Sequence, residues 1–130
     1  MELPIRLSQD SREPIYYQIE SQLKALIAGG QLATGTPLPS IRSLSKDLEI
    51  SVITTRRAYQ NLEQHGFIHT TQGRGTFVAA MADDIKQQVK ISTVYQIIEQ
   101  AIDTALQYDY SLAQIEEIAV EILNERRKDP

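Results

Sequence analysis

The chain has 130 residues, of which 42% are hydrophobic and 23% charged, as in one ordinary folded domain with or without a small appendage. This length excludes a large multidomain enzyme, and the absence of cysteine excludes disulfides, thiolate metal sites and cysteine nucleophiles. No apolar stretch reaches the ~18 residues that a membrane span needs, and the N-terminus lacks a signal-peptide pattern. We therefore expect a cytoplasmic protein that makes no membrane contact.

The formal net charge of −4 conceals a difference between two segments of the chain. Residues 1–80 contain eight Lys and Arg against seven Asp and Glu, a net of +1, whereas residues 81–130 contain five against ten, a net of −5. Charge asymmetry of this kind indicates two parts with separate tasks. We place the boundary between residues 80 and 81.

The first predicted helix begins after Pro14, because isoleucine and leucine then recur at helical spacing as far as Ile27. Gly29 and Gly30 end this helix. Residues 29–39 hold three glycines and two prolines in eleven positions, so we expect an ordered loop or a short extended strand there.

A pair of short helices is predicted next. Ser40 is a good N-cap for a helix over about 41–48, and Ser51 is a good N-cap for another that reaches about Gln64 before Gly66 stops it. Two short helices joined by a turn of about three residues have the spacing of a helix-turn-helix.

The following segment has the composition of a β-hairpin. Aromatic and β-branched residues dominate 67–71 and 76–79, and the turn sequence between them is Gln72-Gly73-Arg74-Gly75. Three helices followed by a hairpin with a basic tip form a winged helix-turn-helix. The expected fold is therefore mainly α with a small β-hairpin, an N-terminal winged helix-turn-helix over 1–80 followed by a two-helix segment over 81–130.

In the C-terminal segment we predict a long helix over about 84–107, weakest at Ile91-Ser92-Thr93, and a second helix that begins at Ser111 with a capping box to Gln114. Two amphipathic helices cannot close a core alone, so their apolar faces must dock on the first domain or on another copy of the chain. We favour a homodimer. Its predicted contacts are Val94, Ile98, Ala101, Ile102, Ala105, Ile115, Ala119 and Ile122.

The third predicted helix exposes donors that suit the major groove of DNA. Projected at about 100° per residue, its outer face contains Ile53, Arg57, Gln60 and Gln64, flanked by Thr54, Arg56 and Asn61. Ile53 is unusual, because the exposure of an aliphatic side chain to water is unfavourable. It either contacts a thymine methyl or packs beneath the wing or the first helix.

Two further arginines stand at positions where a winged helix can reach DNA. Arg42 lies at the start of the second helix, within reach of a phosphate or a guanine edge, and Arg74 lies between two glycines at the tip of the hairpin. The alternative for each is a solvated surface arginine.

The sequence offers no catalytic or metal-binding constellation. His65 and His69 have no third ligand type clustered with them, so we expect neither a metal nor another cofactor. Carboxylates such as Glu116, Glu117 and Glu121 describe a solvated helix face, and no phosphate loop or nucleophile elbow is present. We therefore do not expect an enzyme. The main alternative to DNA binding is a protein interaction module that uses the winged helix as a docking surface.

Four sequence runs occur in a specific order and spacing. They are Gly35-Thr-Pro-Leu-Pro-Ser-Ile-Arg42-Ser-Leu, Ile50-Ser51-x-x-Thr54-x-Arg56-x-Ala58-Tyr59-x-x-Leu62-Glu63, Gly66-Phe67-Ile68 and Gly73-Arg74-Gly75-Thr76-Phe77-Val78. Over about residues 10–79 they resemble the DNA-binding domain of the GntR family of bacterial transcriptional regulators. The short C-terminal segment resembles the YtrA-type subfamily, whose members append only about two helices for dimerisation.

This resemblance implies a winged-helix dimer on double-stranded DNA with a two-fold operator. It also implies repression of an ABC-transporter operon, frequently one that includes the regulator's own gene, and leaves open whether an effector binds. Val52 and Ile53 stand where many members have polar or basic residues, so the base preference is also open. The full set of predicted DNA contacts is Arg42, Ser51, Val52, Ile53, Thr54, Arg56, Arg57, Gln60, Gln72, Gly73, Arg74 and Gly75.

Overall fold

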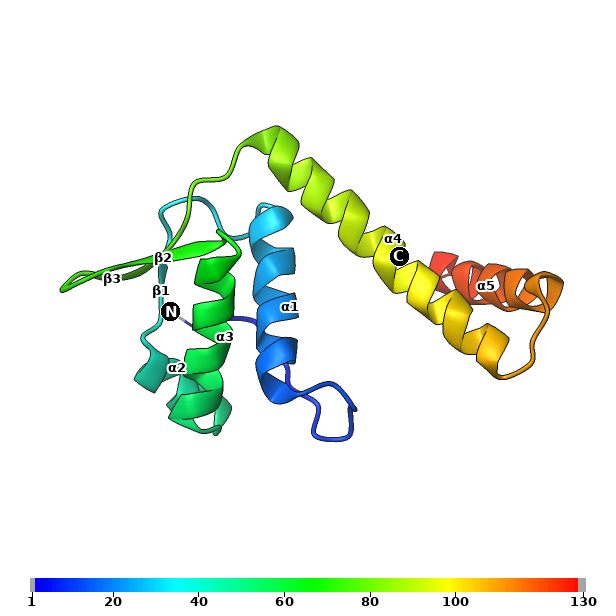
Figure 1. The fold of residues 1–130 in the computed structure, drawn as a ribbon, viewed down its shortest axis with the longest axis horizontal. Coiled ribbons are helices and arrows are strands. Elements are labelled where there is room, and N and C mark those ends of the chain that lie inside the picture. Colours follow the sequence, from blue (N-terminus) through cyan, green and yellow to red (C-terminus); the bar gives the residue numbers. More distant parts are fainter. Residues whose placement is uncertain (1, 129–130) are drawn as a thin grey trace. The chain divides into compact units, whose positions relative to one another are not determined.

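The computed structural model describes residues 2–128, which form five helices and a three-stranded sheet (Figure 1). Residues 1, 129 and 130, at the outer ends of the two predicted segments, lie outside the described residues. The chain divides into two compact units between Lys90 and Ile91, inside helix α4 (Asp83–Gln107). The first turns of α4 thus belong to the N-terminal unit.

Helix α1 (Ile15–Ala28) is the first helix of the N-terminal unit and confirms the first predicted helix. Pro14 occupies the N-cap, where its missing N–H costs nothing, and Gly29 forms the C-cap. The apolar stripe of α1 is completely buried and consists of Ile19, Leu23 and Ile27.

Helices α2 (Ile41–Leu48) and α3 (Val52–Gln64) form the predicted helix-turn-helix. The hydroxyls of Ser40 and Ser51 accept hydrogen bonds from the backbone N–H three residues further on, at 3.0 and 3.1 Å. Both predicted N-caps are therefore confirmed. Between the helices Glu49 adopts the left-handed conformation with φ 57°, which turns the chain sharply enough to start α3 at once.

The sheet has the order β1-β3-β2 and is antiparallel throughout. Strands β2 (Ile68–Thr71) and β3 (Gly75–Val78) form the predicted wing hairpin, which Figure 1 shows extending from the helices. Strand β1 (Pro37–Leu38) adds to the free edge of β3.

The wing therefore contains a third strand that the hairpin prediction lacked. The sequence predicts a loop or a short extended strand over residues 29–39, and the strand interpretation is correct for two of these positions. Pro37 pairs opposite Phe77 at the edge of the sheet, where a proline without an N–H is tolerated. A pairing across forty residues has no local signal in the sequence.

The core of the N-terminal unit lies between α1, α3 and the sheet. Besides the α1 stripe, its most deeply buried members are Leu44, Ala58, Leu62, Ile68 and Val78. Met81 and Val89 pack against this core from the junction and the first turns of α4, so the unit extends past the predicted wing.

Two glutamines of α1 hold the N-terminal segment against the helix. The Gln22 amide donates to the carbonyl of Arg6 at 2.7 Å and accepts from its N–H at 2.8 Å. Gln18 makes the same pair of bonds to the backbone of Ser8, at 3.0 and 2.8 Å. This amide clamp, formed by Gln18 and Gln22, delivers the Ile5 side chain to the core.

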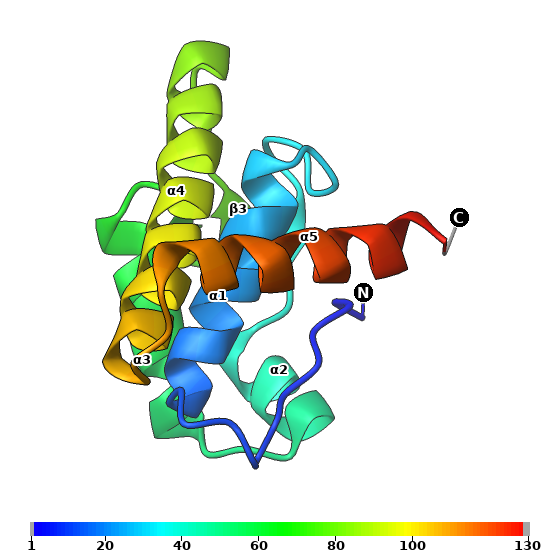
Figure 2. The same cartoon turned by 90° about the vertical axis from the view of Figure 1, so that its right-hand side faces the viewer.

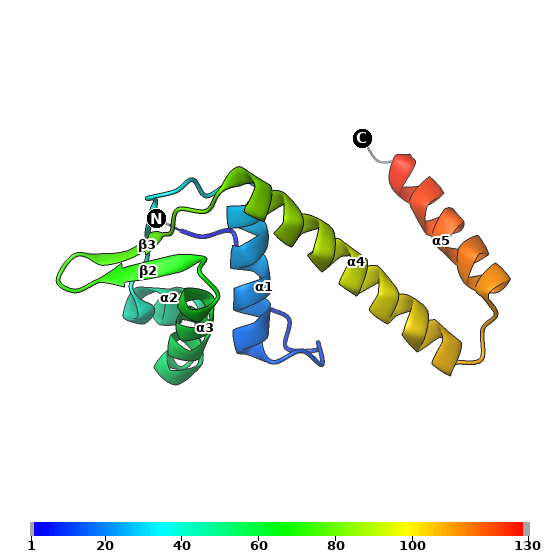
Figure 3. The ribbon, with the colours of Figure 1, turned by 45° about the horizontal axis from the view of Figure 1, so that its top comes forward.

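In the C-terminal unit, α5 (Leu112–Arg127) leaves the end of α4 at a wide angle (Figures 2 and 3). Ser111 and Gln114 make both bonds of the predicted capping box, at 2.8 and 3.1 Å. No helix among residues 2–128 has the length and apolarity to cross a membrane. The large apolar side chains of this unit that remain exposed are Ile91, Val94, Tyr95, Ile97, Ile98, Leu106, Tyr108, Tyr110, Leu112, Ile118, Val120, Ile122 and Leu123.

Candidate nucleic-acid interface

The orientation of α3 is fixed by buried polar contacts. The hydroxyls of Ser45 on α2 and Thr55 on α3 lie 2.8 Å apart inside the core. The Tyr59 hydroxyl donates to the carbonyl of Pro39 at 2.7 Å, which ties α3 to the loop before α2. Burial raises the pKa of the Tyr59 phenol, so it stays neutral and remains a donor. These bonds determine which face of α3 is presented outward.

The outward face of α3 begins with an exposed aliphatic side chain. Ile53 is 77% exposed, so it does not pack beneath the wing or α1. Val52 beside it is 37% exposed. Arg56 and Gln60 follow on the next turn and are also exposed. The first two turns of α3 therefore present an apolar pair next to a guanidinium and an amide.

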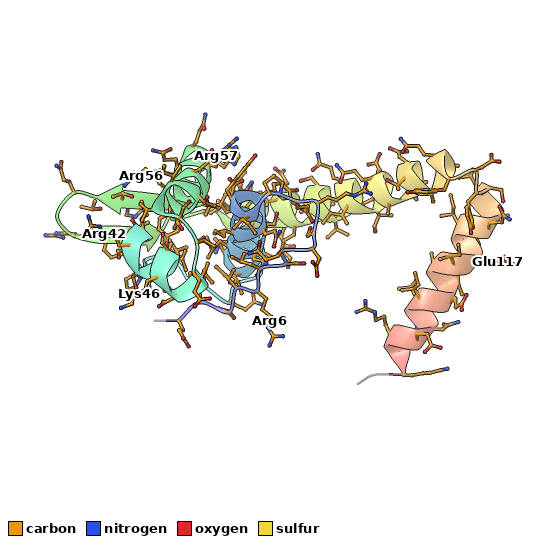
Figure 4. All side chains as sticks on the ribbon, turned by 90° about the horizontal axis from the view of Figure 1, so that it is seen from below. Arg6, Arg42, Lys46, Arg56, Arg57 and Glu117 are labelled. Atoms are coloured by element: carbon orange, nitrogen blue, oxygen red, sulfur yellow. The ribbon has the colours of Figure 1, made fainter. Side chains whose placement is uncertain are left out.

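The structure separates the two adjacent arginines of α3. The guanidinium carbon of Arg57 lies 3.9 Å from the ring centroid of Tyr16, a cation–π contact that holds Arg57 toward α1. Arg56 lies with Arg42 on the side nearer the wing (Figure 4). Among residues 2–128 Arg56 makes no such contact with an aromatic ring. Of the two, Arg56 is the side chain free to approach a ligand on the wing side.

Two of the predicted contact residues also serve the fold. Ser51 caps α3, and its hydroxyl lies 2.8 Å from that of Thr54. Thr54 is half-buried. Their hydroxyls are thus engaged with the helix end, although the exposed edge of Ser51 still borders the outward face.

The wing ends in an exposed turn whose shape requires glycine. Gly73 and Gly75, on either side of Arg74, have φ of 80° and 125°, values that other residues adopt only with strain. The Arg74 N–H donates to the carbonyl of Thr71 at 2.9 Å and closes the turn. The predicted residues Gln72 to Gly75 are all exposed at the tip.

A side chain that sequence reasoning missed anchors the wing to α3. The Glu63 carboxylate accepts a hydrogen bond from the backbone N–H of Thr70 on β2 at 3.1 Å. This bond holds the middle of β2 against the end of α3. It joins two different elements, so no local pattern in the sequence indicated it.

Lys46 is a further exposed cation that was not among the predicted contacts. It lies one helical turn after Arg42 on α2, and both side chains are exposed (Figure 4). The spacing of four residues was the available signal. We use the term basic face for the exposed cations of α2, α3 and the wing tip: Arg42, Lys46, Arg56 and Arg74.

The predicted dimer contacts remain accessible in the C-terminal unit. Val94, Ile98 and Ile122 are each more than half exposed, and Ala101 and Ala119 are exposed as well. Ile102, Ala105 and Ile115 are half-buried. The prediction omitted other exposed apolar side chains of the same unit, among them Tyr95, Ile97 and Leu112.

The geometry is that of a nucleic-acid interface. The major groove admits an α-helix, and a helix with exposed donors on its first turns can read base edges there. Cations on a neighbouring helix and on a projecting turn are placed to contact phosphates on either side. Within residues 2–128 no cluster of three or more His, Asp or Glu side chains is arranged to hold a metal ion.

Comparison with known proteins places this geometry in a family. Residues 15–78 match the model described as bacterial regulatory proteins, gntR family. The transcriptional repressor YtrA of Bacillus subtilis is 32% identical over 118 residues, which cover 91% of each chain. The repressor NagR of the same organism is 43% identical over 75 residues, 58% of this chain. The chain spans only 31% of NagR's length.

Solved structures agree with these relatives. A GntR family transcriptional regulator from Listeria monocytogenes superposes with a TM-score of 0.70 at 27% identity, covering 86% of this chain and 97% of that one. The DNA-binding domain of AraR in complex with operator ORE1 matches with a TM-score of 0.50 at 27% identity, over 59% and 94% of the chains. The chain belongs to the GntR family of bacterial transcriptional regulators, and its N-terminal unit is the winged helix-turn-helix DNA-binding domain of that family.

Proposed function

We propose that the protein is a homodimeric repressor that places α3 in the major groove of a two-fold operator and the wing against the adjacent minor groove. The observation that carries this proposal is the basic face, whose four exposed cations come from α2, α3 and the tip of the wing, together with the exposed first turns of α3. Charge of this kind neutralises phosphates and makes binding strong and salt-dependent.

Dimerisation is supported by the exposed apolar residues of α4 and α5. Side chains such as Val94, Ile98 and Ile122 are more than half exposed, which disfavours an isolated chain in water. A second copy offers the same surface, so a two-fold contact buries both. Such a dimer presents two copies of α3, and a two-fold operator matches that symmetry.

The target we propose is an ABC-transporter operon, together with the regulator's own gene. This part rests on the YtrA-type resemblance and on the 32% identity to the repressor YtrA over nearly its whole length. The cytoplasm is the compartment in which such a regulator acts.

The test is a fluorescence anisotropy titration of the full chain against duplexes tiled from its own upstream region and from neighbouring transporter operons. A scrambled duplex of equal composition is the control, and each titration is run at two salt concentrations. We expect one duplex to bind tightly, with an affinity that falls steeply as salt rises. Weak and equal binding to all duplexes would remove these operons as targets, and no binding at low salt would favour the protein-docking alternative.

A further inference from the structure

We propose that Val52 and Ile53 form an apolar reader of thymine, so that each operator half-site contains a thymine recognised through its C5 methyl group. This inference rests on the proposed function, because it states what the same α3 face reads. We call the two side chains the methyl reader.

The fold provides no other use for the Ile53 side chain. The first turn of α3 has four β-branched residues in a row, Val52 to Thr55, a residue type that weakens helices. Thr55 is completely buried beside Ser45, and Thr54 bonds to the cap Ser51. Ile53, at 77% exposure, contributes neither to the core nor to the cap.

The charges around the methyl reader favour DNA over a protein as its partner. A protein-docking surface is depleted of charge at its centre. Here Arg56 follows Ile53 by three residues on the same helix, and residues 52–60 contain no acidic residue. Arg42 and Arg74, both exposed, extend the positive charge onto α2 and the wing.

Thymine is the base that an aliphatic side chain can identify in the major groove. Each base pair displays its own pattern there, and thymine alone among the four bases adds a methyl group at C5. The N-terminal residues of a recognition helix are those that meet base edges. Val52 and Ile53 are the first two residues of α3, so the pair occupies that position.

The spacing between Ile53 and Arg56 predicts where the thymine lies within the half-site. Ile53 and Arg56 are separated by three residues, about 4.5 Å along a helix axis, which is close to the ~3.4 Å spacing of base pairs. The thymine is therefore expected within one or two base pairs of the group that Arg56 contacts. Ile53 is the larger contributor, because Val52 is less exposed.

The experiment replaces each thymine of the bound operator by deoxyuridine, one position at a time in both half-sites. Uracil keeps the same hydrogen-bonding groups and lacks only the methyl. We expect a substitution at one position in one half-site to weaken binding of the full chain by about fourfold, because one methyl-sized group is no longer buried. The same substitution in both half-sites should weaken binding by about 15-fold. Fluorescence anisotropy at fixed salt measures the ratio.

The same titrations are then repeated with Ile53→Ala, so that the change in the protein is combined with the change in the DNA. This variant should bind the thymine and uracil operators nearly equally, and its thermal unfolding should match that of the wild type because Ile53 is exposed. Ile85→Ala is the matched control, the same change at an exposed isoleucine of α4 outside the predicted DNA contacts, and should keep the wild-type ratio.

The outcomes separate this inference from the proposed function. Specific operator binding that no uracil substitution weakens, or an Ile53→Ala variant that keeps the full discrimination, would overturn the methyl reader and leave the repressor proposal standing. A wild-type chain that binds no duplex better than a scrambled one would overturn both.

Discussion

The two units of the chain differ in the burial of their apolar side chains. The N-terminal unit buries Ile19, Leu23, Leu62 and Ile68 almost completely and turns its arginines outward. Beyond Lys90, α4 and α5 have no buried residue in the described part of the chain, and their apolar side chains lie in water. The first unit therefore has a buried core of its own, whereas the second exposes the apolar surface on which the proposed dimer rests. In that proposal, folding and assembly depend on different parts of one short sequence.

The sharpest test of this contrast is Ile98→Glu. A carboxylate on the apolar surface of α4 would have to be desolvated in a dimer, so we expect the protein to become monomeric while its winged helix remains folded. Operator affinity should fall by at least about 100-fold, because two half-sites would no longer bind jointly. Light scattering and anisotropy measure both effects.

Gln100→Glu is the matched control, because it adds the same charge at an exposed position on the opposite face of α4. It should remain dimeric. A dimeric Ile98→Glu protein with wild-type operator affinity would show that this surface does not assemble the protein.

A second test compares the two adjacent arginines of α3. Arg56→Ala should weaken specific operator binding by about 1–3 kcal/mol and leave the dimer intact. Arg57→Ala should lose mainly its contact with Tyr16, at a cost to folding stability of about 1 kcal/mol or less. Anisotropy and thermal unfolding of both variants give the comparison. Equal losses of affinity would return Arg57 to the contact surface on the same footing as Arg56.

Tyr59→Phe tests the N-terminal unit alone. Loss of the bond to the carbonyl of Pro39 should lower the free energy of unfolding by about 1 kcal/mol. Because burial raises the pKa of Tyr59 above its ordinary value, its contribution is fully present below about pH 10 and is lost as the pH rises further. Denaturant titrations at pH 7 and pH 10.5 should therefore show a smaller difference between variant and wild type at the higher pH. A constant difference would contradict this coupling.

The smallest expected effect is that of Arg74→Ala at the wing tip. Its side chain makes no recorded contact within the described residues and lies at the end of an exposed turn. We expect weaker binding to every duplex alike, with a salt slope reduced by about one per subunit. Titrations of specific and scrambled duplexes over a range of salt concentrations provide the slope. Loss of affinity for the specific duplex alone would assign Arg74 to base recognition.

The sequence predicted well those features that depend on neighbouring residues. The caps at Ser40, Ser51 and Ser111 and the helix ends at Gly29 and Gly66 involve contacts within a few positions, so composition and spacing reveal them. The order of these elements was also sufficient for the winged helix-turn-helix, and the match over residues 15–78 confirms the family.

Contacts between residues that are distant in the sequence could not be predicted from composition and spacing. The pairing of β1 with β3, the bond from Glu63 to β2 and the contact between Arg57 and Tyr16 each join separate elements. A helical projection places Arg57 on the outward face because it contains no information about the ring of α1 beside it. Likewise, the sequence left two interpretations of Ile53, and its exposure removes the one in which it packs beneath the wing or α1.

The amide clamp has a consequence for how this chain tolerates change. Gln18 and Gln22 bind Arg6 and Ser8 through backbone N–H and carbonyl groups, so the side chains at those two positions do not take part. Substitutions at positions 6 and 8 should therefore leave the clamp in place, whereas changes to Gln18, Gln22 or the core residue Ile5 should loosen the N-terminal segment. The segment before α1 has no sequence pattern that would predict its position, and it is held in place by two glutamines of the following helix.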